Sequence, residues 1–299
     1  MEIFQKIKVY YNNASVIVKI IMINAFVFIV SNVLSTLGFL GQVSFDLEEY
    51  FYFPADINLY YLRFWSIFTY IFFHRDLFHL LFNMMWLYFF GNIFLNIHTT
   101  KRFVNLYVLG AIFGALLYMF AYTVLPVFVA SSSALRGASA AVSAVMVAAT
   151  LQVPNKLVRF MFIPVNLKLW WITLGFLIMD FVRIQSGNSG GHIAHLGGAL
   201  IGYVYMVQLQ KGNDIGLPIE KFIDWCVTLF RGAEKKNTFR KVYRNKSKKA
   251  TKKKSKDTIH SKSEHQKTVD AILEKISKNG YESLSKKEKE MLFKSGNKL

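Results

Sequence analysis

Six long apolar segments, separated by more polar connections, constrain the fold of this chain more than any other feature. They lie near residues 20–40, 77–97, 103–125, 138–154, 169–183 and 192–209. Crossing the hydrocarbon core of a bilayer takes about 20 apolar residues in a helix, so each segment is a candidate transmembrane helix. The composition agrees, because 53% of the 299 residues are hydrophobic. We therefore expect an all-α polytopic membrane protein built on a bundle of six transmembrane helices.

The charges of the connecting segments predict how these helices cross the membrane. Basic connections favour the cytoplasmic side. The segment 41–63 is mainly acidic, whereas the second connection holds Lys101 and Arg102 and the fourth holds Lys156 and Arg159. This alternation predicts cytoplasmic termini, and it makes the second, fourth and sixth helices run in one direction. We expect an integral protein of the cell (inner) membrane.

Positive charge is concentrated after the last apolar segment. Residues 231–299 hold 22 basic against 8 acidic side chains, a net charge of +14 out of +18 for the chain. The expected organisation is a cytoplasmic N-terminus (1–19), a six-span domain (20–210), an interfacial amphipathic helix (211–232), a Lys-rich linker (233–262) and a small helical C-terminal segment (263–299). The tail is therefore predicted to be cytoplasmic and basic.

The basic tail suggests a lipid partner rather than a nucleic acid. A Lys-rich stretch beside a membrane is attracted to anionic lipid. Aromatic residues are not interleaved with these lysines and no nucleic-acid-binding motif accompanies them, so we expect no nucleic-acid partner. In the C-terminal segment, Ser285 and Glu288 have the spacing of a helix capping box. The sequence gives no indication of oligomeric state.

Polar residues gather at the starts of three apolar segments. His79 and Asn83 begin the second, Ser139 begins the fourth, and His192 and His195 begin the sixth. Because these helices are expected to run in one direction, all five residues should lie at similar depth on the outer side. Intramembrane polar residues usually mark function. A serine needs a base to become a nucleophile, and a histidine can supply one.

Three motifs around these residues resemble those of the rhomboid family of intramembrane serine proteases, over roughly residues 20–210. They are His74-x4-His79-x3-Asn83, Gly137-Ala138-Ser139-Ala140 and Ala194-His195-x2-Gly198-x3-Gly202. The resemblance implies a six-helix rhomboid-like bundle with a catalytic dyad, in which Ser139 is the nucleophile and His195 the general base and then acid. It also implies an oxyanion site made of the Ser139 N–H, His79 and Asn83, with His74 in a supporting role.

Two departures from the family pattern concern the surroundings of this dyad. Ala140 replaces the glycine that commonly follows the nucleophile, and Ser143 replaces an aromatic residue against which the histidine ring stacks. The His195 ring is therefore expected to be oriented by a different residue, and His192 is one candidate for that role. Asp180 is either a third member of the catalytic group or a capping or pairing residue, and the sequence leaves that choice open.

Glycines near these motifs are expected to serve helix packing. Small residues let membrane helices approach closely. On this basis Gly198 and Gly202 should bring the sixth helix against the fourth, and Gly137 is expected to contribute to packing at the site. Gly110 and Gly114 repeat the same spacing in the third helix.

The expected function is a serine endopeptidase that hydrolyses peptide bonds of single-span or other membrane proteins, without a cofactor or metal. The first alternative is a catalytically inactive rhomboid-like factor that binds membrane proteins. The second is a metalloprotease or transporter that uses the histidines as ligands or as a proton relay. No His-Glu-x-x-His sequence occurs, which disfavours the second alternative.

Overall fold

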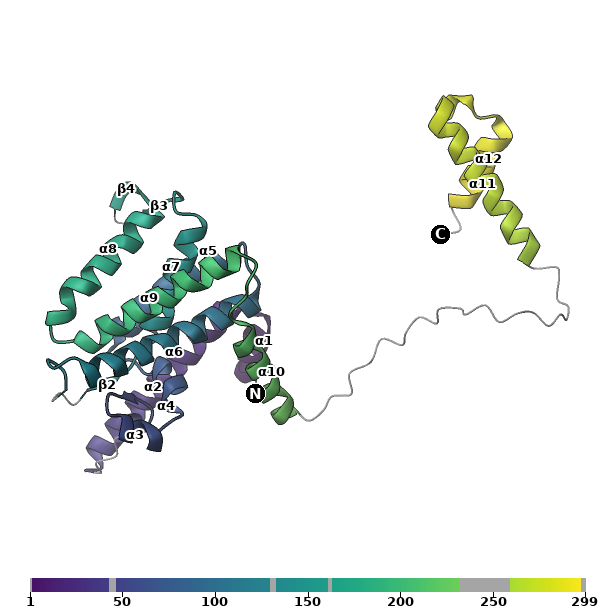
Figure 1. Ribbon diagram of the computed structural model, residues 1–299. Coiled ribbons are helices and arrows are strands. Elements are labelled where there is room, and N and C mark those ends of the chain that lie inside the picture. Colours follow the sequence, from purple (N-terminus) through teal and green to yellow (C-terminus); the bar gives the residue numbers. More distant parts are fainter. Residues whose placement is uncertain (1, 43–46, 130–132, 161–162, 232–258, 297–299) are drawn as a thin grey trace, which may run out of the picture. The chain divides into compact units, whose positions relative to one another are not determined.

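The computed structural model describes residues 2–42, 47–129, 133–160, 163–231 and 259–296. The chain divides into two compact units, Met1–Glu234 and Lys235–Leu299. Both are shown in Figure 1 and each is described by itself. Most of the predicted linker, 233–262, lies outside the described residues.

Helices make up most of the first unit, and one helix occupies each of the six apolar segments (Figure 1). These helices are α2 (Val16–Leu40), α5 (Leu77–Leu95), α6 (Thr100–Val124), α7 (Ser139–Gln152), α8 (Leu169–Val182) and α9 (Ser189–Gln210). Three of them, α2, α5 and α6, are long and apolar enough to cross a membrane by length and composition. The helices α7 and α8 have 14 residues each. At a rise of 1.5 Å per residue they extend only about 21 Å, less than the thickness of a hydrocarbon core.

Shorter elements precede or connect these helices. They are the helices α1 (Glu2–Asn13), α3 (Ile57–Leu62) and α4 (Ser66–Thr69), and the 3₁₀ turns η1 (Leu47–Tyr50), η2 (Tyr70–Phe72) and η3 (Arg183–Gln185). Strand β1 (Phe53–Pro54) pairs antiparallel with β2 (Ala134–Leu135), and β3 (Leu157–Phe160) pairs antiparallel with β4 (Ile163–Lys168). The first pair links the aromatic segment before α5 to the loop that precedes α7.

Side chains define where several of the helices begin. The Asp76 carboxylate accepts a hydrogen bond from the His79 backbone N–H at 2.8 Å, which caps the start of α5. Thr99 caps α6 in the same manner through the Arg102 N–H. Such caps satisfy backbone donors that a helix leaves unpaired in its first turn. The start of α5 is therefore fixed by sequence-local contacts.

Close contacts between small residues show how α6, α7 and α9 run relative to one another. A Cβ added to Gly198 would lie 2.0 Å from the Ala140 carbonyl oxygen, and one added to Gly202 would lie 2.4 Å from that of Ala144. Positions four apart on α9 thus meet positions four apart on α7 in the same order, so the two helices are parallel. On α6, Gly110 lies against Ala144 and Gly114 lies against Ala140. The order along α6 is therefore the reverse of that along α7, and the two helices are antiparallel. The small-residue seam, as we call Gly110, Gly114, Ala140, Ala144, Gly198 and Gly202, holds these three helices together.

The helix α5 also runs parallel to α7. His79, near the start of α5, lies against Gly137, and His98, just after its end, contacts Gln152 at the end of α7. The helices α5, α7 and α9 therefore share one direction, in agreement with the direction predicted from the loop charges.

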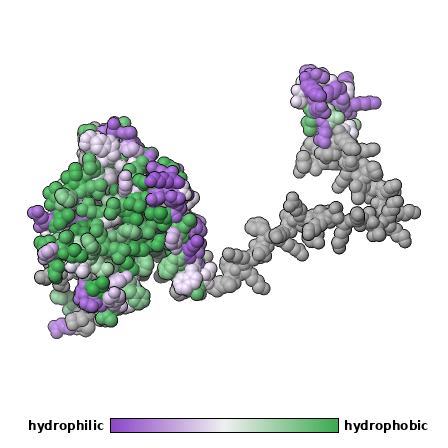
Figure 2. Space-filling view, viewed as in Figure 1, coloured by the Kyte–Doolittle hydropathy of each residue, from purple (hydrophilic) through white to green (hydrophobic). Residues whose placement is uncertain are grey.

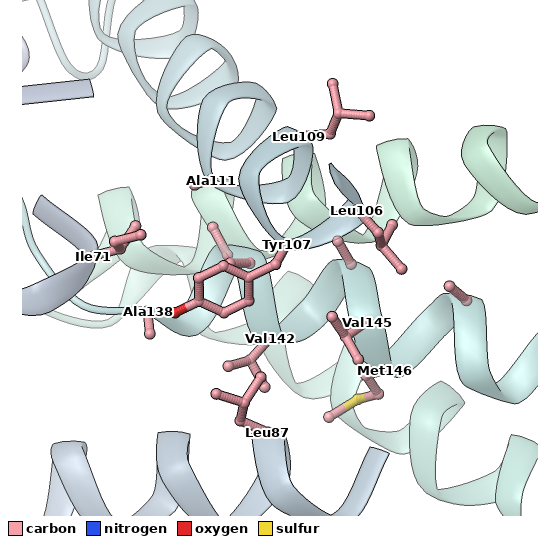
Figure 3. Close-up of a cluster of buried hydrophobic side chains, with 14 of the residues drawn as sticks. Ile71, Leu87, Leu106, Tyr107, Leu109, Ala111, Ala138, Val142, Val145 and Met146 are labelled. Atoms are coloured by element: carbon pink, nitrogen blue, oxygen red, sulfur yellow. The ribbon is translucent and has the colours of Figure 1, made fainter. Parts of the chain in front are cut away.

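The core of the first unit fills the space between these helices. In Figure 3 the ring of Tyr107 from α6 lies against α7, with its hydroxyl end near Ala138 and its edge near Val142. Leu87 of α5 approaches the same cluster and is fully buried. The outer surface is also largely apolar, and the face in Figure 2 is mostly hydrophobic over the first unit. Exposed apolar side chains on that scale are expected where lipid is the solvent.

The helix α10 (Leu217–Arg231) follows α9 and is tied to the start of α6. Lys101 pairs with Glu220 at 2.6 Å, and Arg102 pairs with Asp214 at 3.1 Å. The Tyr205 hydroxyl also donates to Asp214. These contacts give α10 a defined starting point on the bundle.

The second unit contains two helices, α11 (Ile259–Asn279) and α12 (Lys286–Gly296), joined through the 3₁₀ turn η4 (Tyr281–Ser283). The Ser285 backbone N–H donates to the Glu288 carboxylate at 2.7 Å, and Lys275 donates to the same group at 3.0 Å. These two contacts lower the pKa of Glu288 to about 2. Ile272 and Leu284 are buried between the helices. The Glu288 carboxylate thus takes part in the cap at the start of α12 and links this helix to α11 through Lys275.

Candidate active site

A cavity of about 670 Å³ opens between α5, α7, α8 and α9. All four residues predicted for catalysis or oxyanion binding line it, namely Ser139, His195, His79 and Asn83. His74 and His192 are not among its lining residues. The cavity brings together residues up to 120 positions apart in the chain, which is the separation of Arg75 and His195.

Ser139 is the first residue of α7 and is half-buried. The chain enters this helix through Gly137, whose φ of +115° lies in a region that favours glycine. A Cβ at Gly137 would lie 2.7 Å from Cε1 of His79 and 2.8 Å from its Nε2. Gly137 therefore differs from the predicted helix-packing role, because it forms the turn before α7 and accommodates the His79 ring. The absence of a side chain at this position lets the His79 ring lie against the turn that precedes Ser139.

His79 and Asn83 lie one turn apart on α5. The Arg75 backbone N–H donates to His79 Nδ1 at 3.4 Å, which leaves Nε2 as the protonated nitrogen of a neutral ring. One hydrogen of the Asn83 amide is used by the His79 carbonyl at 3.0 Å, and the second remains available. Both side chains can therefore present an N–H donor to the cavity. Oxyanion stabilisation requires donors of this kind.

His74 supports the turn from behind and does not line the cavity. Its Nε2 accepts a hydrogen bond from the Ala138 backbone N–H at 3.4 Å, and its side chain is buried. Burial, with a further contribution from neighbouring His79, lowers the pKa of His74 to about 3. The ring is therefore neutral at physiological pH. Only a neutral imidazole can accept this hydrogen bond.

His195 is held by Asp180, which comes from α8. The distance from His195 Nδ1 to Asp180 Oδ1 is 2.8 Å, and His192 Nδ1 lies 2.9 Å from the same oxygen. Asp180 is buried, with only 8% of its surface exposed. A carboxylate oxygen that accepts two N–H groups fixes both rings. His192 also contacts His195 directly, because the two rings meet edge to face with their centroids 5.8 Å apart.

Ser139 and His195 face the same cavity without a direct hydrogen bond between them among the described residues. Ser143, one turn after Ser139, also lines the cavity. It stands where an aromatic partner for the histidine was expected from the resemblance. The smaller side chain leaves the His195 ring to be positioned by its Nδ1 contact with Asp180.

Aromatic and basic side chains also contribute to the wall. Trp86 of α5 meets Phe176 of α8 edge to face, with ring centroids 4.8 Å apart. Arg136, which precedes the Gly137 turn, donates to the Tyr52 hydroxyl at 2.9 Å and lies over the Tyr52 ring. These contacts connect the aromatic segment before α5 to the serine loop.

One donor set in this region could also hold a metal ion. The ligating atoms of Asp180, His192 and His195 lie within 4.8 Å of one another. A carboxylate and two imidazoles are ligands that suit Zn²⁺. The two Nδ1 to Oδ1 distances of 2.8 and 2.9 Å are those of hydrogen bonds, so the three groups satisfy one another in this arrangement.

Comparison with known proteins agrees with this architecture. Residues 61–211, half of the chain, match the family described as Rhomboid domain. The chain is also 32% identical over 164 residues to RHOMBOID-like protein 12, mitochondrial, from Arabidopsis thaliana, covering 50% of this chain and 48% of that protein. It thus spans about half the length of this relative. The chain belongs to the rhomboid family.

The C-terminal unit matches a different family. Residues 247–295 match a Family of unknown function (DUF6576). This match includes the helices α11 and α12 and the Ser285–Glu288 cap.

One contribution to the site was not predicted from the sequence, and another was predicted with its role left open. Arg136 carries no motif of its own, and its contact with Tyr52 joins positions 84 residues apart. Asp180 was expected to be a third member of the catalytic group or a capping or pairing residue, and its contact with both histidines comes from the structure. An isolated acidic residue in an apolar segment was the signal that could have paired it with the histidines.

Proposed function

We propose that this rhomboid protein is an intramembrane serine endopeptidase that hydrolyses peptide bonds of membrane-anchored proteins. One observation carries the proposal: Ser139, His195, His79 and Asn83 all line a single cavity. This constellation contains a hydroxyl nucleophile, a base and donors for an oxyanion. Those are the parts that acyl transfer requires.

In the proposed reaction, His195 Nε2 removes the proton of the Ser139 hydroxyl as its oxygen attacks the peptide carbonyl. The tetrahedral oxyanion accepts hydrogen bonds from the Ser139 backbone N–H, His79 Nε2 and the Asn83 amide. His195 then donates its proton to the leaving amine, which produces an acyl-enzyme on Ser139. A water molecule, deprotonated by His195, releases the second product and restores the hydroxyl.

We further propose that six helices cross the membrane and that both termini face the cytoplasm, in the cell membrane. The shared direction of α5, α7 and α9 supports this orientation, as does the basic charge between these helices. Two of the six, α7 and α8, are short, so the bilayer would have to thin around them or the loops would have to lie within it. Cysteine scanning with a membrane-impermeant thiol reagent on a Cys226→Ser background would test it. Labelling at the loop 184–188 from the cytoplasmic side would contradict it.

We also propose that anionic lipid binds the basic segment that follows α10. The support is the concentration of positive charge in the sequence there. Reconstitution into vesicles with and without phosphatidylserine, followed by protease protection of the tail, tests this binding. Equal cleavage of the tail in both vesicle types would contradict it.

The proteolytic function is tested by incubating the full chain in detergent with a single-span membrane protein as substrate. Wild type is expected to cleave it, and Ser139→Ala and His195→Ala are expected to reduce the rate by 10³-fold or more, on the order found when triad members are removed. Ser143→Ala is the matched control, since it removes a hydroxyl from the same cavity one turn away. It should keep the rate within about threefold.

A second candidate function is binding of membrane proteins without cleavage. It is favoured by the lack of a direct hydrogen bond between Ser139 and His195 within the described ranges. If wild type and Ser139→Ala both fail to cleave but capture the same substrate equally well, this function replaces the first. Cleavage by wild type alone excludes it.

A further inference from the structure

Among the described residues, the carboxylate that contacts the predicted general base comes from α8, a helix that contains none of the three family motifs. Asp180 lies near the end of α8, and its Oδ1 is 2.8 Å from His195 Nδ1. It is buried, and in the part of the chain that the structure describes its hydrogen-bonding partners are His192 and His195. A buried charge in an apolar helix costs free energy unless it is paired. Its position therefore needs an explanation.

We propose that Asp180 is a positioning residue that orients His195 for proton transfer, so that the site works as a Ser139–His195–Asp180 triad. This inference rests on the proposed peptidase function. Asp180 acts through His195 and does not touch the reacting atoms. In the family pattern an aromatic ring at position 143 would hold the imidazole in place. In this protein a carboxylate on α8 performs that role.

The chemistry of the hydrogen bond fixes the protonation of the imidazole. An ionised carboxylate can only accept hydrogen bonds, so the ring nitrogen that contacts it must carry the proton. A neutral His195 therefore has its proton on Nδ1, and Nε2 keeps its lone pair. Nε2 is then the atom able to receive the Ser139 proton. When His195 becomes positively charged during the reaction, Asp180 also stabilises that charge.

His192 contacts both the carboxylate, through a hydrogen bond, and the His195 ring, edge to face with centroids 5.8 Å apart. Its Nδ1 contacts the same Oδ1 at 2.9 Å, and it sits one turn before His195 on α9. It is not one of the residues that line the cavity. The second N–H compensates part of the desolvation of the buried carboxylate. Loss of His192 should therefore leave the bond between Asp180 and His195 intact.

The hydrogen bond between Asp180 and His195 depends on how α8 packs against α7 and α9. At its other end, Thr173 Oγ1 lies 2.6 Å from Thr150 Oγ1 of α7. The residue Gly175 between these two contacts faces open space. Polar contacts at both ends therefore hold α8 against α7 and α9, and one of them is the proposed positioning bond.

The first test compares steady-state kinetics of wild type with Asp180→Asn, which keeps the shape of the side chain but removes its charge. Because an amide can donate to Nδ1 and favour the wrong tautomer, kcat should fall by about 10²- to 10⁴-fold while KM stays within about threefold. Asp180→Glu should recover part of the lost kcat. His192→Ala is the comparison variant, and its kcat should fall less than that of Asp180→Asn, because Asp180 keeps its contact with His195.

The second test does not depend on activity. With ¹⁵N-labelled histidine, the His195 resonances, assigned by comparison with His195→Gln, should indicate the Nδ1–H tautomer in wild type. In Asp180→Asn they should shift toward the Nε2–H tautomer. Thermal unfolding of each variant shows whether it is folded when these spectra are recorded.

Several outcomes would overturn the inference while leaving the peptidase function intact. They are an Asp180→Asn variant with wild-type kcat, an Nε2–H tautomer in wild type, or a loss in His192→Ala as large as that in Asp180→Asn. Stoichiometric zinc in the purified protein, with activity lost on its removal, would also overturn it, because the same three groups would then be metal ligands. If wild type itself does not cleave and equals Ser139→Ala, the proposed function fails first.

Discussion

The contacts along the small-residue seam and the contacts of helix α8 differ in how closely the backbones pack and in how polar the buried side chains are. Along the seam, backbones approach so closely that a Cβ at Gly198 would lie 2.0 Å from a carbonyl oxygen. On α8, a Cβ at Gly175 would meet nothing within 4 Å. The buried residues of α8 are Leu169, Thr173 and Asp180, and two of these three are polar.

This difference separates two requirements of the site. The seam fixes the backbones that carry Ser139 and His195, because close-packed helices cannot shift without steric clash. The helix α8 brings Asp180 to His195 through polar contacts, whose strength depends on geometry and charge. Mutations in the seam should therefore act by changing side-chain volume, and mutations on α8 should act by removing hydrogen bonds.

The largest effect is expected from adding volume to the seam. Gly198→Val should destabilise the fold by about 3 kcal/mol or more, because overpacking of a backbone contact forces the helices apart. Cleavage should be lost with it. Thermal unfolding in detergent and the substrate assay measure both quantities.

Gly175→Ala is the matched control for this substitution, since it adds a methyl group to α8 in open space. Its effect on the free energy of unfolding should stay within about 0.5 kcal/mol. Similar losses for Gly198→Val and Gly175→Ala would contradict the distinction between the two regions.

A smaller effect is expected when a low pH protonates His74, which accepts a hydrogen bond from the Ala138 backbone N–H just before α7. The pKa of His74 is about 3 in the folded protein and about 6.5 in an unfolded chain, so the unfolded state binds a proton first as the pH falls. The stability that depends on neutral His74 is present above pH 6.5 and is lost between pH 6.5 and 3. Between pH 7 and 4.5 the loss should be about 2–3 kcal/mol.

This pH effect is measured by comparing unfolding of wild type and His74→Gln at the two pH values. A glutamine oxygen can still accept from the Ala138 N–H but does not titrate in this range. The variant should therefore lose less stability on acidification than wild type. Identical losses would show that His74 makes no contribution to acid sensitivity.

The smallest effect concerns the polar attachment of α8. Thr173→Val leaves the buried Thr150 hydroxyl without its partner and should destabilise the fold by about 1 kcal/mol. The double variant Thr150→Val/Thr173→Val should recover part of this loss in a double-mutant cycle. Thr123→Val, at an exposed site on α6 where the hydroxyl bonds only its own helix, is the control. A coupling energy near zero for the pair would contradict a role for this contact.

Much of the helical architecture could be predicted because it depends on local sequence. Apolar length predicted helices, and loop charge predicted the shared direction of α5, α7 and α9. The fourth segment, predicted over 138–154 with Ser139 at its start, is the helix α7, Ser139–Gln152. The count of six membrane crossings and the cytoplasmic tail stay predictions, because the length and hydropathy of the described helices identify three candidate spans.

The site was predictable where motif spacing determines proximity. His79 and Asn83 are one helical turn apart, and the three motifs lie at the same end of parallel helices. The pairing of Asp180 with both His192 and His195 was not predictable, because it depends on how α8 rotates against α9. The role of Gly137 also required the structure, since a positive φ and the approach of the His79 ring are tertiary features.

The parallel course of α5, α7 and α9 has an electrostatic consequence for the cavity. Each helix carries a partial positive charge of roughly half a unit at its amino end. All three amino ends contribute residues to the cavity wall, through His79, Ser139 and Gly190. This charge acts mainly within the first turn of each helix, so it favours a negative charge that develops on a carbonyl oxygen bound beside Ser139. Asp180 lies instead near the carboxyl end of α8, where the partial charge is negative, so its carboxylate depends on the two histidine contacts.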